Sequence, residues 1–171
     1  MKKEVIIDMK KAGIINIAIF IIAFILSAML QVYLHAEYCF KLSWLSLVYV
    51  ILIIPAHEGI HAIGFLLLSR APRDSVEFGF HKEYFAPYCH CSNFENTKFG
   101  YISSMMLPNI ILTIVSVVIL FFTANICWSL VAGFVISSGA GDYYMAYLVS
   151  KYPKGIKFVD HPSEPGFYVV E

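Results

Sequence analysis

The chain has 171 residues, of which 59% are hydrophobic and 14% charged, and its formal net charge is zero. Such a high apolar fraction lies outside the range of soluble domains, and the length suits one compact unit. Zero net charge, with no basic stripe carrying aromatic residues, argues against nucleic-acid binding. The composition therefore predicts a single integral membrane domain that covers residues 1–171.

Four apolar segments are long enough to cross a bilayer as helices. The first follows two lysines, as a signal peptide would, but it is longer than a signal core and lacks a small-residue cleavage site, so we expect it to be retained. Little more than Asn125 separates the last two, which predicts a tight helical hairpin. We expect an all-α membrane protein, a bundle of about four transmembrane helices at residues 12–34, 42–68, 101–124 and 126–149.

The Lys and Arg residues are distributed unequally about these segments. Eleven of the twelve fall in the N-terminal segment, the 69–100 loop and the 150–171 tail, which four spans place on one side, and Lys41 alone lies opposite. The positive-inside rule therefore predicts a multi-pass protein of the cell membrane with both termini in the cytoplasm.

The cytoplasmic loop carries an alternating pattern. Val76, Phe78 and Phe80 alternate with other residues, and an aromatic stretch follows at residues 84–88. This pattern predicts a small hairpin at the membrane surface. We expect the tail to be irregular, apart from a short strand at Phe167–Val170.

Residues 57–62 have the sequence HEGIHA inside the second apolar segment, where His57, Glu58 and His61 are the only charged or imidazole side chains. Such groups are costly at bilayer depth, so they indicate a functional site. On a helix the two histidines lie one turn apart on one face, the spacing that binds Zn²⁺, and Glu58 is placed to take a proton from a metal-bound water. An HExxH pattern arises by chance in about one such sequence in a hundred, and more rarely within an apolar run.

A third ligand must come from another segment at the same depth. At about 1.5 Å per helical residue, His61 lies roughly 10 Å inside the cytoplasmic end of its span, and Asp142 lies roughly 10 Å inside the same face in the fourth span. Asp142 is the only other acidic residue in any span. We therefore predict it as the third ligand.

Other candidate ligands fit less well. His35 belongs to the opposite side of the membrane, and the Cys89-His90-Cys91 run lacks the CxxC spacing of an independent metal site. A pairing of Cys39 with Cys127 stays open. The loop and tail residues would have to fold inward over the site to take part: His81, Cys89, His90, Cys91, His161 and Glu164.

Two prolines interrupt the apolar segments. Pro55 precedes the histidine motif, and we expect the helix to break there. Pro108 precedes Asn109 in the third span, where two interpretations stay open. Asn109 either satisfies carbonyls freed by a kink, or its amide binds the substrate backbone or a developing oxyanion.

Several segments together resemble a known family: HEGIHAIGF, GFHKEYFAPYCHC, LPNIILTIV, SGAGDYYMAYLV and VDHPSEPGFYVV. From the second span onward the chain is similar to the bacterial putative zincin peptidase family, and more distantly to site-2 protease type intramembrane zinc metalloproteases. The resemblance implies metal ligands at His57, His61 and Asp142, a catalytic carboxylate at Glu58, and a substrate-side element at Pro108-Asn109. The chain departs from site-2 proteases in its GAGD context and in lacking a PDZ module.

We therefore expect an intramembrane zinc metalloprotease that cleaves peptide or transmembrane-segment substrates near the cytoplasmic face. A catalytically silent scaffold is one alternative, and it would tolerate loss of Glu58. A metal transporter is another, but it needs polar groups through the full membrane thickness, and the outer halves of the spans carry no charged residue or His. A hydrolase of lipid-borne amides would use the same residues.

Overall fold

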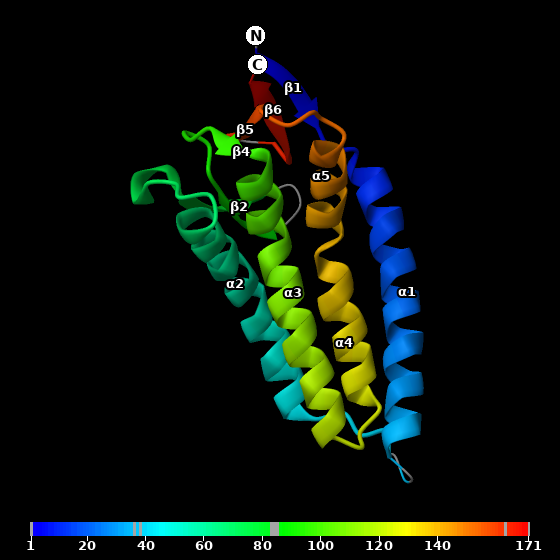
Figure 1. Cartoon of the computed structure of the whole chain (residues 1–171). Coiled ribbons are helices and arrows are strands. Elements are labelled where there is room, and N and C mark those ends of the chain that lie inside the picture. Colours follow the sequence, from blue (N-terminus) through cyan, green and yellow to red (C-terminus); the bar gives the residue numbers. More distant parts are fainter. Residues whose placement is uncertain (1, 36, 38, 83–85, 163, 171) are drawn as a thin grey trace.

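The protein is described here by a computed structural model, which places residues 2–35, 37, 39–82, 86–162 and 164–170. Helices run side by side along the molecule, and a sheet covers the end at which both termini lie (Figure 1). The helices are α1 (Met9–Leu34), α2 (Trp44–Leu67), α3 (Lys98–Phe122), α4 (Cys127–Ser138) and α5 (Ala140–Ser150), with a short 3-10 helix at Arg73–Ser75. The strands are β1 (Lys2–Ile6), β2 (Glu77–His81), β3 (Ala86–His90), β4 (Asn96–Thr97), β5 (Lys157–Asp160) and β6 (Gly166–Val170).

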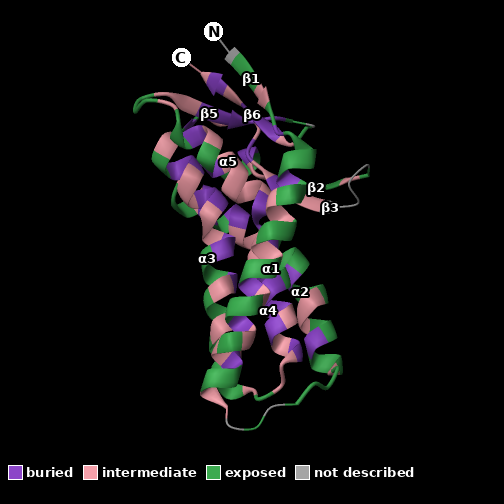
Figure 2. Cartoon of the chain, turned by 90° about the vertical axis from the view of Figure 1, so that its right-hand side faces the viewer, coloured by how far each residue is buried: buried purple, intermediate pink, exposed green. Residues whose placement is uncertain are grey.

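Among the described residues, α1, α2 and α3 are long and apolar enough to cross a membrane. Large hydrophobic side chains on these helices remain exposed, for example Ile14, Leu52 and Val118. Figure 2 shows exposed positions all along the helices, with buried positions scattered among them and present in the strands of the sheet. Such surfaces are stable in lipid, and the chain is therefore expected to associate with a membrane.

The fourth expected span is a broken pair of helices instead of one continuous helix. α4 and α5 have 12 and 11 residues, and Gly139 between them has φ −80° and ψ 12°. Just before it, the Ser137 and Ser138 hydroxyls donate to the carbonyls of Phe134 and Val135, at 3.1 and 2.7 Å. Serine hydroxyls compete with the helical hydrogen bonds and glycine is a weak helix former, so the helix ends here.

α2 runs without a break through Pro55. The break expected there is therefore wrong. A proline inside a helix removes one N–H donor, but the residues on both sides keep their helical hydrogen bonds. As a consequence, a single rigid helix carries the whole HEGIHA motif.

The sheet at the end of the helices joins the two ends of the chain. Its strand order is β1-β6-β5-β4, all pairs are antiparallel, and Val5 lies opposite Phe167. β2 and β3 form a separate antiparallel hairpin with Phe78 opposite Cys89, as predicted from the alternating pattern. The mostly helical architecture, the hairpin and the strand near residue 167 are confirmed, whereas the four-stranded sheet was not expected in an all-α fold.

Aromatic packing fixes the four-stranded sheet on α3. The ring of Tyr101 lies 5.9 Å from that of Phe158 and 6.1 Å from that of Phe167, and all three side chains are completely buried. Aromatic pairs at such distances add to the free energy gained from their burial. The tail is thus part of the folded core and covers the ends of the helices that lie near the two chain termini.

The opposite end of the helices is held together by one buried amide. Gln31 of α1 is fully buried; its Nε2 donates to the Thr123 carbonyl at 2.8 Å, and its Oε1 accepts from the Ser129 hydroxyl at 2.7 Å. Polar groups at membrane depth favour such interhelical hydrogen bonds. Gln31 therefore fixes α1 against the connection between α3 and α4.

Candidate metal centre and its cavity

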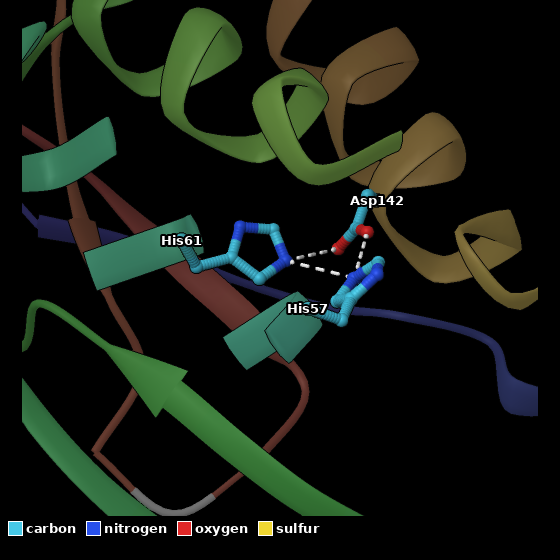
Figure 3. A group of neighbouring side chains, drawn as sticks. All are labelled: His57, His61 and Asp142. Atoms are coloured by element: carbon cyan, nitrogen blue, oxygen red, sulfur yellow. Dashed lines mark hydrogen bonds and ion pairs between the residues drawn. The ribbon is translucent and has the colours of Figure 1, made fainter. Parts of the chain in front are cut away.

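Two imidazoles and one carboxylate meet between α2 and α5 (Figure 3). His57 and His61 are one turn apart on α2, and their Nε2 atoms are 3.2 Å from each other. Asp142 lies in the first turn of α5; its Oδ2 is 3.1 Å from His57 Nε2 and its Oδ1 is 3.4 Å from His61 Nε2. The helix break at Gly139 directs this first turn toward α2.

The distances between the three ligand atoms match those around a tetrahedral zinc ion. Zn–N distances of about 2.0–2.1 Å and tetrahedral angles separate ligand atoms by about 3.3–3.4 Å. The three separations in the cluster are 3.1, 3.2 and 3.4 Å. Two imidazoles and a carboxylate are also donors that zinc accepts, and a catalytic site keeps a fourth position open. The residues therefore fit a catalytic zinc ion.

A hydrogen bond from His61 fixes which of its nitrogens faces the cluster. His61 Nδ1 lies 3.0 Å from the Ser104 carbonyl oxygen of α3. A carbonyl oxygen only accepts, so Nδ1 carries the proton, and in the neutral ring the Nε2 lone pair faces His57 and Asp142. This is the tautomer that a metal-binding imidazole needs.

Asn109 approaches the cluster from α3. Its Nδ2 donates to Asp142 Oδ2 at 2.9 Å and to the Met105 carbonyl at 3.2 Å. The amide has two N–H groups, and both are engaged by these acceptors. The expected substrate contact of Asn109 stays a prediction, whereas its contact with Asp142 is part of the structure.

Glu58 lines the same cavity as the three clustered residues, but the cluster itself consists of His57, His61 and Asp142. The role of Glu58 as a proton-transferring group beside a metal stays a prediction. Within the described parts of the chain, no second group of three or more His, Cys, Asp or Glu side chains lies close enough together to hold a metal ion.

The cavity has a volume of about 420 Å³ and extends between two chemically different regions. Ile53, Ile54 and Phe134 line it within the helices, whereas Tyr88 and His90 of β3 line it at the sheet end. The tail also contributes to its wall, with His161, Pro162, Glu164, Pro165 and Gly166. The tail therefore folds inward over the site, and His161 is only 9% exposed.

A buried carboxylate at the sheet end was missed by the sequence analysis. Asp160 of β5 accepts hydrogen bonds from the Tyr101 hydroxyl and, at 2.7 Å, from the Cys91 backbone N–H. Burial raises the pKa of Asp160 above its ordinary value, although the Tyr101 hydrogen bond opposes this shift. Asp160 thereby ties the tail to α3 and to the end of the hairpin. No spacing pattern marks it in the sequence.

The cysteines stay outside the metal cluster. Burial, followed by the negative charge of Glu58, raises the pKa of the Cys89 thiol to about 12, so the thiol is protonated at neutral pH. Cys91 donates its backbone N–H to Asp160, and His90 lies 3.5 Å from Glu77. Cys39 and Cys127 are free thiols and do not pair. The Cys89-His90-Cys91 run serves the hairpin and the cavity wall in this structure.

The fold thus combines a group of side chains that could hold a metal ion with helices of membrane-spanning length. The putative zincin peptidase family matches residues 50–157, and the chain belongs to this family. The matched range runs from α2 to the start of β5 and includes all residues of the cluster together with Glu58 and Asn109. No curated protein and no solved structure matches the chain. Family membership implies a peptidase that uses zinc.

Proposed function

We propose that this protein is an intramembrane zinc metalloprotease of the site-2 protease type, which hydrolyses peptide bonds in membrane-embedded or membrane-adjacent substrates. The observation that carries the proposal is the cluster of His57, His61 and Asp142 beside Glu58, in one cavity between helices of membrane-spanning length. Membership of the zincin family supports it independently.

His57, His61 and Asp142 would hold the zinc ion through Nε2, Nε2 and a carboxylate oxygen. When bound, zinc supplies Lewis acidity that polarises a peptide carbonyl and lowers the pKa of a water molecule. The Glu58 carboxylate would accept the proton of the attacking water and deliver it to the leaving amine. Glu58 is suited to this work because it lines the cavity without belonging to the ligand cluster.

The shape of the cavity supports an extended substrate. Apolar side chains line its inner part and the hairpin strand β3 lines its outer part, through Pro87, Tyr88, Cys89 and His90. A helical peptide bond is shielded by its own hydrogen bonds, so the substrate must unwind near the cleavage point. We propose that the unwound segment lies along β3 and adds to it as a strand.

The proposed orientation follows from the position of the sheet. The N-terminal segment, the loop before α3 and the tail lie at the same end of the molecule in Figure 1. Together with Lys98, the first residue of α3, these segments hold eleven of the twelve Lys and Arg residues. We propose that this end faces the cytoplasm of a bacterial cell membrane, so that substrates are cut near that face.

The experiment compares Glu58→Gln with wild-type protein in a survey of membrane-protein fragments. Glu58→Gln should keep its zinc and its fold, because a neutral amide is cheaper than a carboxylate at this depth, but should lose nearly all turnover. Asp142→Ala should lose zinc affinity and turnover together. Glu95→Gln is the matched control, since Glu95 is an exposed residue just before β4 and lies outside the cavity.

Fragments that depend on wild-type Glu58 and persist in the Glu95→Gln strain would support proteolysis. If Glu58→Gln processes a confirmed substrate at the wild-type rate, the hydrolytic mechanism is wrong. If it also complements a deletion strain fully, the catalytically silent scaffold replaces the enzyme as the better account.

A further inference from the structure

Helix α3 contributes none of the three clustered side chains, yet it contacts two of them. The Ser104 carbonyl oxygen is 3.0 Å from His61 Nδ1, and Asn109 Nδ2 is 2.9 Å from Asp142 Oδ2. These two contacts come from residues five positions apart on a single helix. Contacts from α3 therefore hold His61 and Asp142 in the cluster.

The Ser104 carbonyl is available because of Pro108. In an α-helix the carbonyl of residue 104 accepts from the backbone N–H of residue 108, and a proline has no such N–H. Pro108 lies inside α3 and is fully buried. The freed carbonyl accepts from His61 instead, which orients the imidazole and keeps its Nε2 directed at the cluster.

The orientation of the Asn109 amide is fixed by its partners. Both neighbours of Nδ2, the Met105 carbonyl and the Asp142 carboxylate, are acceptors, so the nitrogen and not the oxygen must face them. Asn109 Oδ1 is buried and has no hydrogen-bond partner among the described residues. A side chain that leaves its oxygen unpaired in this way indicates a constraint on its donor end.

Gly139 makes room for this amide. A Cβ at residue 139 would lie 1.6 Å from Asn109 Oδ1, 2.3 Å from its Cγ and 2.7 Å from its Nδ2. Gly139 has φ −80°, which other residues adopt without strain, so the glycine is needed for space and not for its backbone freedom. The break between α4 and α5 thus lets Asn109 reach Asp142.

We propose that Pro108 and Asn109 are positioning residues for the metal site: Pro108 frees the Ser104 carbonyl that orients His61, and Asn109 orients the Asp142 carboxylate. This inference rests on the proposed zinc site, and it gives the pair a role other than substrate binding. Hydrogen bonds to ligating side chains commonly affect metal affinity by about 10–100-fold.

The test measures the zinc dissociation constant of the full-length purified protein by competition with a chelator. Asn109→Ala should weaken zinc binding about 10–100-fold. Gly139→Ala should weaken it as well, because its Cβ displaces the Asn109 amide. The double variant combines Asn109→Ala with Gly139→Ala. It lacks the Asn109 amide that the new Cβ would displace, so its zinc dissociation constant should equal that of Asn109→Ala alone.

Ser116→Ala is the matched control. Ser116 is buried on α3 two turns beyond Asn109, and its hydroxyl is 3.2 Å from the Tyr49 hydroxyl of α2. The Ser116→Ala substitution removes a polar contact between α2 and α3 without affecting the cluster. Its zinc affinity should therefore stay within twofold of wild type. Cobalt substituted for zinc gives a second readout, because its visible absorption spectrum should change in Asn109→Ala and not in Ser116→Ala.

The inference is overturned if Asn109→Ala binds zinc as tightly as wild type, or if the two substitutions weaken binding independently in the double variant. Pro108→Ala restores an N–H that competes for the Ser104 carbonyl, so it should also weaken zinc binding and change the cobalt spectrum. If the zinc affinity and the cobalt spectrum of Pro108→Ala match those of wild type, Pro108 has no part in positioning the ligands. Wild-type protein that binds no zinc would instead refute the proposed function itself.

Discussion

Gly64 and Gly59 lie on the same helix, and the structure predicts opposite results for replacing each by alanine. A Cβ at Gly64 would lie 2.9 Å from the Ser104 Cα and 3.2 Å from the Ser104 carbonyl oxygen of α3. A Cβ at Gly59, between the two histidines, would meet nothing within 4 Å. The motif glycine should therefore be replaceable, and the glycine outside the motif should not.

The magnitude follows from the distance. Ordinary carbon–carbon contacts begin near 3.5 Å, so Gly64→Ala must separate α2 from α3 by about half an ångström or more. Overpacking of this kind costs about 1–3 kcal/mol, and at about 2–4 °C per kcal/mol the midpoint of thermal unfolding should fall by roughly 2–12 °C. The hydrogen bond between His61 and the Ser104 carbonyl crosses the same interface, so zinc affinity should fall too.

The assay is thermal unfolding of detergent-purified protein, with a zinc titration of each variant. Gly59→Ala should match wild type or gain up to about 1 kcal/mol in unfolding free energy, because alanine favours the helix. Wild-type stability and zinc affinity in Gly64→Ala would refute the close approach of the two helices. Equal damage in Gly59→Ala would refute the open surroundings of that residue.

Three further predictions concern the sheet end and the topology. Because the pKa of Asp160 is raised in the folded protein, the folded state holds this proton more tightly than the unfolded chain. The free energy of unfolding of the wild type should therefore fall, relative to that of Asp160→Asn, as the pH rises from about 4 through the raised pKa. At neutral pH a maleimide should modify the exposed Cys39 rapidly and the buried, protonated Cys89 only after unfolding, as peptide mapping would show. On intact cells, an impermeant maleimide should reach Cys39 and miss Lys82→Cys; external labelling at residue 82 would reverse the proposed orientation.

Local and additive signals explain what the sequence predicted well. The spacing of His57 and His61 follows from helical periodicity, and the depth of Asp142 could be counted from the end of its segment. The alternation of Val76, Phe78 and Phe80 indicated the hairpin without reference to the rest of the chain. The structure brings His57, His61 and Asp142 together, although their role as ligands stays a prediction.

Long-range pairing explains what the sequence did not predict. The first residues, KKEVI, have the pattern of a basic flank of a membrane helix, and their strand partner β6 lies at the other end of the chain. Asp160 and Tyr101 meet only because that sheet folds onto α3. Pro55 was overestimated as a helix breaker, whereas the segment 126–149 was expected to be one span and is interrupted at Gly139.

The central claim is that His57, His61 and Asp142 hold a zinc ion, and metal analysis of purified protein tests it most directly. Wild-type protein should carry about one zinc per chain, and His57→Ala should lose it, because a catalytic zinc site needs three protein ligands. Each variant's fold should be checked by its thermal unfolding, so that loss of metal is not confused with loss of structure. Metal content unchanged in a folded His57→Ala protein would contradict the account.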